Sequence, residues 1–172
     1  MESSNESIWS KDTEYLDLVK DLLAHPEVKQ LSRFVHHYFT DRLEHSISVS
    51  YKSYLIAKKF NLDYRSVARA GLLHDFFLFT SAEVEAMGDG SHNNLHPKLA
   101  LANAKRITTI NKIEEDIILK HMFAVSLSAP PKYRESLVVS MVDKYVAMEE
   151  VIMPISRIIK YKTMLAMYSF SY

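Results

Sequence analysis

The stretch ARAGLLHDFF, residues 68–77, places two ionisable side chains, His74 and Asp75, where an apolar helix ends. His74 shares an i, i+4, i+7 stripe with Val67 and Gly71, so it is expected to face the interior of the protein. Burying a polar or charged group without a partner costs several kcal/mol. The pair therefore needs partners from other parts of the chain, and the rest of the sequence supplies candidates.

The composition favours a helical protein of one domain. The chain has 172 residues, of which 48% are hydrophobic and 24% are charged, as in ordinary soluble proteins. Three glycines and five prolines supply few turn signals, which favours helices over many short strands. We expect an all-α, single-domain bundle of about six to eight helices over residues 11–172, preceded by a flexible tail at residues 1–10.

Charge and cysteine content exclude several classes of protein. Basic and acidic residues number 21 each, and no basic stripe marks a surface for a nucleic-acid duplex. The absence of cysteine excludes disulfides and thiolate metal ligands. The N-terminus, MESSNESIWSKD, lacks the apolar core of a signal peptide, and no run of about 18 apolar residues predicts a membrane span. These features predict a cytoplasmic protein without a membrane partner.

The C-terminal segment VIMPISRIIKYKTMLAMYSFSY, residues 151–172, is apolar with basic residues in between. Such a segment can lie on a membrane surface, but we favour a last core helix or a helix of a homodimer. In a homodimer, the contact face would consist of Tyr161, Met164, Leu165 and Tyr168.

Hydrophobic spacing and capping residues predict the order of the helices. Ser10 or Asp12 is expected to cap the first helix, and Asp63 a later one. Proline at positions 26 and 97 indicates two further helix starts, while VHHYFTDR (35–42) and GDGSHNN (88–94) indicate loops. The predicted helices cover residues 12–24, 26–34, 42–60, 63–74, 97–107, 112–122 and 135–150, with a short segment near 81–87 and a C-terminal helix after about 151.

Further polar residues lie on the apolar faces of these helices. His45, His121 and Asp143 each share a face with apolar residues, and His96 opens a helix after a loop. A single histidine on such a face is usually a core residue bonded to a carbonyl, whereas a buried aspartate requires a cation, donors or a metal. Bundles build metal sites from imidazole and carboxylate groups on different helices. Together with the His-Asp pair, these residues predict a metal site.

The order of these residues resembles the defining pattern of the HD-domain superfamily of metal-dependent phosphohydrolases. A histidine, a His-Asp pair 29 residues later and a helical aspartate occur here at positions 45, 74–75 and 143. RLEHSISVSYKSYLIAKKFNLDYRSVARAGLLHDFF resembles the first two motifs of the family, and DIILKHM and SLVVSMVDKY resemble later ones. LHPKLALANA and ILKHM resemble the positions of two extra histidines in members with two metals. The resemblance covers about residues 42–150.

The resemblance implies two metal ions that share one carboxylate, Asp75. Asp75 and His74 are then the catalytic residues of a site that hydrolyses a phosphate monoester or phosphodiester, of a nucleotide, by a metal-activated hydroxide. One or two divalent ions would be the cofactors, and a ligand set without sulfur suits Fe, Mn, Co, Ni or Zn. The first ion would be held by His45, His74, Asp75 and Asp143, and the second by His96 and His121 with Asp75 as the bridge.

Side chains that hold the phosphate are less clearly marked. Arg42, Lys98 and Lys144 each lie within one turn of an implied ligand, and each also suits a solvated surface cation. Neighbouring helix residues point about 100° apart, so Lys144 is expected to face away from the metals. His37 and His92 lie in predicted loops, where they can act as an acid or base near neutral pH or serve no catalytic purpose.

One position departs from the family pattern. Many members continue after the His-Asp pair with a glycine and a lysine, and the lysine is thought to assist at the phosphate. Here the chain reads HDFFLFT, with Phe77 and Leu78 in those places. We therefore expect a more apolar pocket mouth without that cation, and unchanged metal ligands.

Two other functions suit the same residues. Some proteins with this His/Asp set are mixed-valence di-iron oxygenases, which consume oxygen on an organic substrate and require two irons. A non-catalytic helical module could instead keep a metal for stability or sense a ligand. A structural metal site closes its coordination shell, whereas a catalytic site leaves a position for water. Metal identity, turnover of phosphate esters and oxygen consumption separate the three functions.

Overall fold

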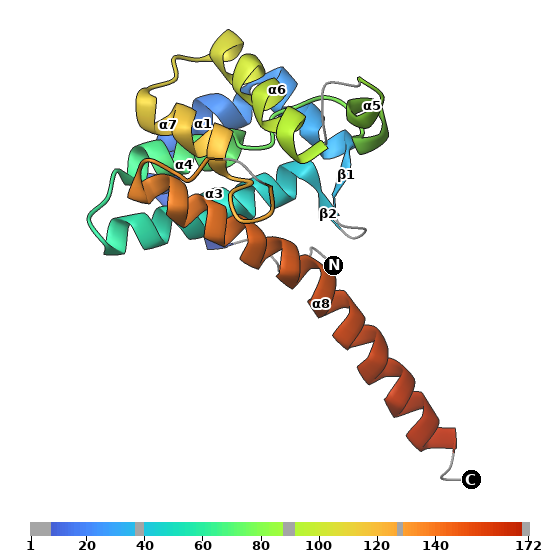
Figure 1. The fold of residues 1–172 in the computed structure, drawn as a ribbon. Helices are drawn as coiled ribbons and strands as arrows, with labels where there is room; N and C mark the ends of the chain where they lie inside the picture. Colours follow the sequence, from blue (N-terminus) through green and yellow to red (C-terminus); the bar gives the residue numbers. More distant parts are fainter. Residues whose placement is uncertain (1–7, 37–39, 88–91, 127–128, 170–172) are drawn as a thin grey trace.

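A computed structural model describes residues 8–36, 40–87, 92–126 and 129–169, with side chains up to residue 152 apart from that of His36. These residues form the expected all-α bundle (Figure 1). α3 packs against α4 and α8, α7 packs against the same two helices, α1 covers α4, and α6 covers α7. The bounds of these helices are α1 Thr13–Ala24, α3 Arg42–Lys59, α4 Tyr64–Leu73, α6 His92–Ile107, α7 Lys112–Lys120 and α8 Arg134–Ser169.

Short elements connect the long helices. The predicted helix at residues 26–34 consists of an α-helical turn followed by a 3₁₀ turn, and the predicted loop at 35–42 includes a small antiparallel hairpin that pairs Val35 with Asp41. The segment near 81–87 is a single short helix whose N-cap is Thr80. These elements are η1 Ile8–Lys11, α2 Pro26–Lys29, η2 Gln30–Arg33, β1 Val35–His36, β2 Thr40–Asp41 and α5 Ser81–Ala86.

Capping interactions fix where the helices begin. The carboxylates of Asp12 and Asp63 each accept a hydrogen bond at 3.0 Å from the backbone N–H three residues later, as the sequence predicts. Asn111 and Glu114 form a reciprocal capping box at the start of α7. Because α4 and α7 begin at fixed points, their C-terminal ends are also fixed, and both ends carry residues of the functional site.

The apolar core lies between α1, α3, α4, α7 and α8. Each fully buried aliphatic or aromatic side chain contributes about 1.5–3 kcal/mol relative to an exposed one. Packing of this core therefore fixes the positions of the helix ends next to which the polar residues of the site lie. Its fully buried members include Tyr15, Val49, Leu72, Ile117 and Val139.

Gly71 allows α4 to approach α3 closely. A Cβ atom at this position would lie 2.9 Å from Ser50 Cα and 3.4 Å from Ser50 N, which are both backbone atoms. We expect Gly71→Ala to lower the free energy of unfolding by about 1–3 kcal/mol, because the two helices must separate to accept the methyl group. Urea unfolding followed by circular dichroism measures the change, with Arg65→Ala on the exposed face of α4 as the control. Equal stability of Gly71→Ala and the wild type would contradict the close approach.

α6 begins five residues earlier than the sequence predicts. Proline at position 97 indicated a helix start, but the helix already includes His92, and residues 88–91 lie outside the described chain. Proline cannot donate to the carbonyl four residues earlier. Other contacts hold the preceding turn: His96 Nδ1 donates to His92 O at 2.8 Å, and the two rings stack with their centroids 4.7 Å apart. His96 therefore lies in the second turn of a helix and does not open it.

The two ends of the chain also differ from expectation. Residues 8–10, predicted as part of a tail, begin the 3₁₀ helix η1, and the first seven residues lie outside the description. The predicted helices at 135–150 and after 151 are one continuous helix, α8, whose second half projects beyond the other helices (Figure 1). The side chains of the predicted contact face at 161–168 are not described. Among the helices of the described residues, none has the length and apolarity to cross a membrane.

Candidate metal centre

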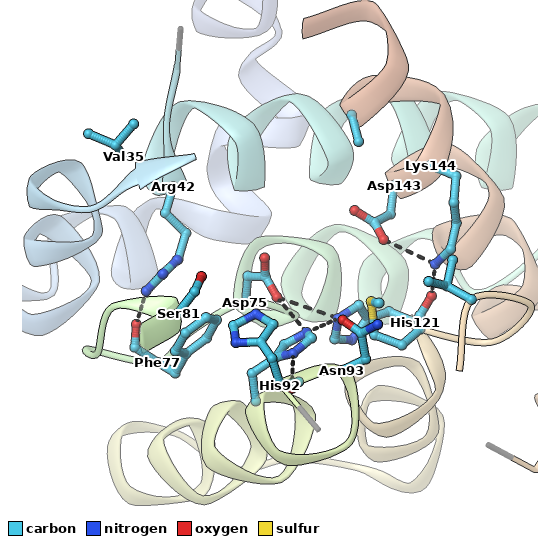
Figure 2. A pocket seen from close by; sticks show the side chains of 14 residues that line it. Val35, Arg42, Asp75, Phe77, Ser81, His92, Asn93, His121, Asp143 and Lys144 are labelled. Carbon is cyan, nitrogen blue, oxygen red and sulfur yellow. Dashed lines mark hydrogen bonds and ion pairs between the residues drawn. The ribbon is translucent and has the colours of Figure 1, made fainter. Parts of the chain in front are cut away.

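Six buried polar residues from five segments meet inside the bundle. The most distant pair in contact is separated by 98 positions in the sequence. Figure 2 shows three of them, Asp75, His121 and Asp143, around one cavity. The structure brings together all six residues that were predicted as ligands, and each is at most 8% exposed: His45 on α3, His74 and Asp75 after α4, His96 on α6, His121 after α7, and Asp143 on α8.

α4 and α7 each end at a histidine of the centre. His74 and His121 are the C-caps of these helices, and each ring has its Nδ1 atom 2.8 Å from the backbone carbonyl three residues earlier. His96 makes an equivalent contact to His92 O. Because a carbonyl oxygen only accepts hydrogen bonds, each of the three rings donates from Nδ1. The Nε2 atoms are thereby directed at the carboxylates.

The two oxygens of Asp143 have different partners. Oδ1 lies 3.1 Å from His45 Nε2 and 3.6 Å from His74 Nε2. Oδ2 accepts a hydrogen bond from Lys144 Nζ at 3.2 Å, and the same ammonium group donates to His121 O. Lys144 therefore faces the centre, contrary to the sequence prediction, because its long side chain folds back over Asp143 (Figure 2).

Asp75 stands between the pair His96 and His121 and the single ring of His74. Its Oδ1 atom lies 3.3 Å from His96 Nε2 and 3.4 Å from His121 Nε2, and its Oδ2 atom lies 3.8 Å from His74 Nε2. One oxygen of the Asp75 carboxylate thus lies near the rings of His96 and His121, and the other lies near the ring of His74. In this position Asp75 would offer one oxygen to each side if metal ions were bound there.

The buried charges of the centre shift one another's pKa values. Burial alone would raise the pKa of Asp75, but His74, His121 and His96 outweigh it and hold this pKa well below the usual range. Burial would lower the pKa of His45, but hydrogen bonds to Asp143 and Glu150 raise it to about 9. Asp75 is therefore ionised at neutral pH, and the His45 ring is protonated on both nitrogens. A metal ion that binds His45 must displace one of these protons.

The donor set fits divalent metal ions. Within the described residues, His74 Nε2 and Asp75 Oδ1 are buried and have no hydrogen-bond partner. His96 Nε2 and His121 Nε2 lie 2.8 Å apart. Because Nδ1 is protonated on both rings, the lone pairs of the two Nε2 atoms face each other. A shared proton or a metal cation relieves this repulsive contact. Nitrogen and oxygen donors without sulfur suit Fe, Mn, Co, Ni and Zn. Two triads of ligand atoms, each with all three atoms within 4.8 Å of one another, are His45, His74 and Asp143, and His74, Asp75 and His121.

Glu150 is a residue of the centre that the sequence analysis missed. Its carboxylate lies 3.0 Å and 3.2 Å from His45 Nδ1, on the side of the ring away from Asp143. A carboxylate behind a metal-binding histidine fixes the ring's orientation and raises its basicity. Glu150 follows Asp143 by seven residues, two helical turns, and this spacing was the signal that places both on one face of α8.

We expect Glu150→Gln to weaken metal binding by about 10-fold to 100-fold, because the amide still accepts from His45 Nδ1 but no longer stabilises positive charge there. Competition with a chromogenic chelator measures the change. Glu149→Gln is a matched control, since the Glu149 side chain pairs with Lys52 and Tyr145 outside the centre. Equal metal affinities in the two variants would remove Glu150 from the centre.

A cavity of about 430 Å³ opens onto these residues. Arg42 and Lys144 lie at opposite ends of it, with Asp75 between them (Figure 2). Phe77, at the position where many relatives of the HD type have glycine, is 2% exposed and forms part of an apolar wall. The expectation of a more apolar pocket agrees with this lining. The wall consists of Val35, Phe77, Met122, Val125 and Ala147.

Arg42 supplies a buried cation to the cavity. Its guanidinium carbon lies 3.7 Å from the ring centroid of Phe77 and 4.8 Å from that of Phe34. Both Nη atoms donate to backbone carbonyls, those of Phe77 and Phe79. Its Nε atom is buried and has no hydrogen-bond partner among the described residues. The side chain is thus held by carbonyls and aromatic rings, and more than one of its N–H groups has no partner among the described residues.

The other predicted substrate residues divide into two groups. His92 lines the cavity between Phe77 and His96, and burial lowers its pKa. It belongs to α6 and not to a loop as predicted, because the helix begins there. Lys98 is exposed on α6, and it is not among the described side chains that line the cavity. His37 lies outside the described residues.

The fold and the centre define a class, that of all-α proteins in which buried histidines and aspartates from several helices face one cavity and suit divalent metal ions. Residues 42–148 match the family described as HD domain, and the chain belongs to this family.

Comparison with curated proteins finds relatives named ribonuclease Y. The protein of Pseudothermotoga lettingae is 29% identical over 150 residues, which are 79% of this chain and 28% of the relative. That of Clostridium perfringens strain SM101 is 32% identical over 123 residues, 66% of this chain and 24% of the relative. The chain thus spans about a quarter of the length of these relatives. No solved structure matches the chain significantly.

Proposed function

We propose that the protein hydrolyses a phosphate ester of a nucleotide with the help of one or two divalent transition metal ions. The position of Asp75, between the pair His96 and His121 and the single ring of His74, supports this proposal, because a carboxylate so placed would offer one oxygen to each of two metal sites. The proposed ligands are His45, His74, Asp75, His96, His121 and Asp143.

The residues of the chain have separate tasks in this function. Two bound divalent ions supply hydroxide near neutral pH and neutralise the charge of a phosphoryl group. Asp75 and His74 fix the two ligand groups relative to each other. Lys144 holds the second oxygen of Asp143, so that its first oxygen stays directed at His45 and His74. The backbone carbonyls behind the rings fix their orientation.

Three observations favour a nucleotide as the substrate. The cavity volume of about 430 Å³ lies within the range of small-molecule sites. Its apolar wall suits a base, and the guanidinium of Arg42, which lines the cavity, suits a phosphate oxygen. The relatives are named ribonucleases, and cleavage of RNA breaks phosphodiesters. With no net charge on the chain, we expect a mononucleotide or short oligonucleotide rather than a duplex.

The test is a comparison of hydrolysis and oxygen consumption in one preparation. The protein is stripped with a chelator, reloaded separately with Mn, Co, Ni, Zn or Fe, and assayed against nucleoside monophosphates, dinucleotides and short RNA. We expect hydrolysis that chelation abolishes and reloading restores. Oxygen consumption by the iron form without hydrolysis would instead establish the di-iron oxygenase. A metal-replete protein without either activity would be a non-catalytic module.

Arg42 gives the substrate assignment its own prediction. We expect Arg42→Lys to raise the KM for a nucleotide ester by about 10-fold to 100-fold, because hydrogen bonds to charged groups contribute about 1.5–3 kcal/mol and lysine lacks the planar fork of guanidinium donors. Initial rates at saturating metal measure KM and kcat, with metal content and thermal unfolding as checks on folding. Arg33→Lys, an exposed position on η2, is the control. An unchanged KM would exclude Arg42 from the phosphate site.

A further inference from the structure

α8 carries a stripe of exposed apolar side chains on the side away from the bundle. Successive members are four, four, three and four residues apart, so all lie within a narrow arc of the helix. Their exposed fractions range from 44% to 66%. Val139 and Val146, on the opposite side of the helix, are buried in the core. The stripe consists of Leu137, Met141, Tyr145, Met148 and Ile152.

α3 widens the stripe into a face, which we call the α3/α8 face. Leu55 and Ile56 are 44% and 36% exposed and, with Tyr145, line a shallow groove of about 400 Å³ between the two helices. Lys52 and Glu149 form an ion pair at its edge. Single exposed apolar residues are ordinary, but a contiguous patch of this kind marks an interaction surface.

The second half of α8 extends beyond the bundle. The helix continues to Ser169, and in Figure 1 the segment after the α3/α8 face projects away from the other helices. In the sequence of residues 153–169, 10 of 17 residues are hydrophobic, three are basic and none is acidic. Isolated helices of this length are marginally stable in water, and most helices in proteins are stabilised by packing. We therefore expect the projecting segment to pack against a partner.

We propose that two copies of this chain pair through antiparallel α8 helices, with residues 153–169 of each copy lying on the α3/α8 face of the other. The two lengths match: at 1.5 Å per residue the stripe from residue 137 to residue 152 spans about 24 Å and the projecting segment about 26 Å. A two-fold axis near Ile152 then covers both faces and both segments at once, which is the requirement for an isologous dimer.

The spacing and extent of the face suit this partner. Apolar residues three and four apart are the pattern of helices that pair side by side. Residues 137–169 are 33 positions, of which about half would face the other copy, and with Leu55 and Ile56 of α3 the contact approaches the size of a standard interface of about 20–30 residues a side. A second copy is favoured over another partner because one chain supplies both the exposed face and a projecting helix of matching length.

The first test is the mass of the full chain in solution. Sedimentation equilibrium at micromolar concentration is expected to give twice the 19.9 kDa of one chain. Met141→Glu places a charge in the middle of the stripe, and we expect it to raise the dimer dissociation constant roughly 30-fold or more. Met87→Glu, the same change at a residue 41% exposed at the end of α5, leaves the dimer intact. Unaltered circular dichroism and metal content show that both variants fold.

The second test uses the absence of cysteine from the chain. Ile152→Cys places one thiol near the proposed axis, so mild oxidation is expected to link two copies, whereas Met87→Cys is expected to stay unlinked. A monomeric wild type, a dimer that Met141→Glu does not weaken, or a failure of Ile152→Cys to link would overturn the proposal. Binding of the monomer to vesicles of anionic lipid would replace it with a membrane surface.

Discussion

Asp75→Asn is expected to lose both metal ions and with them hydrolysis. Asparagine keeps the shape of aspartate but removes the charge that three imidazoles surround, and its amide nitrogen is not a metal ligand. Since Asp75 Oδ1 faces His96 and His121 while Oδ2 faces His74, neither metal site retains its full ligand set. Loss of several kcal/mol of transition-state stabilisation corresponds to a fall in kcat of about 10³-fold or more.

Elemental analysis after reloading and single-turnover assays measure the two effects of Asp75→Asn separately. Asp17→Asn, an exposed position on α1 whose partner is Lys20, is the matched control and is expected to keep wild-type metal content. An Asp75→Asn protein with a full metal complement and normal activity would refute the bridging position. Thermal unfolding distinguishes a folded, metal-free variant from one that fails to fold.

His121→Ala is expected to lose one metal ion and keep the other. His121 belongs to the group with His96 and the Oδ1 atom of Asp75, whereas His45 belongs to the group with Asp143. Removing a ligand from one group leaves the ligands of the other in place. We therefore expect the metal content to fall from two atoms per chain to one, and hydrolysis to fall by about 10²-fold to 10³-fold, since charge stabilisation from one ion is lost.

The reciprocal variant sharpens this prediction. His45→Ala is expected to leave one ion bound by His96, His121 and Asp75, and the double variant to bind none. His25→Ala, at the N-cap of α2, is the control outside the centre. If the wild type binds two ions and His121→Ala still binds two, His121 is not a ligand. If the wild type binds one ion and His121→Ala keeps it, the second site is absent.

The sequence predicted the helices well where capping residues and apolar stripes agreed. Asp12 and Asp63 cap helices as expected, because a carboxylate before an apolar repeat has one favourable role. The start of α6 was wrong because proline also occurs inside a helix when other contacts hold the preceding turn, and here His96 stacks on His92 and bonds to its carbonyl one turn earlier. The hairpin at 35–41 escaped prediction because two-residue strands have no periodicity to detect.

The candidate site was predictable in its inner residues and less so around them. Histidines and aspartates on apolar faces are costly when unpaired, and this cost together with the resemblance to the HD family predicted that they meet. The contacts of Arg42 depend on the path of the chain after Asp75, where the carbonyls of Phe77 and Phe79 turn toward it, and no sequence pattern fixes that path. Lys144 was misjudged because backbone direction does not determine where a flexible four-carbon side chain ends.

The supply of ligands by five segments has a consequence for the biogenesis of the protein. Asp143 is the last of the six residues to leave the ribosome, and it lies on α8, the last helix among the described residues. An N-terminal portion of the nascent chain that ends before α8 lacks the group that pairs with His45 and His74. We therefore expect the metal position beside His45, His74 and Asp143 to be filled only after α8 has been synthesised, so that occupancy of this position serves as a check on folding of the bundle.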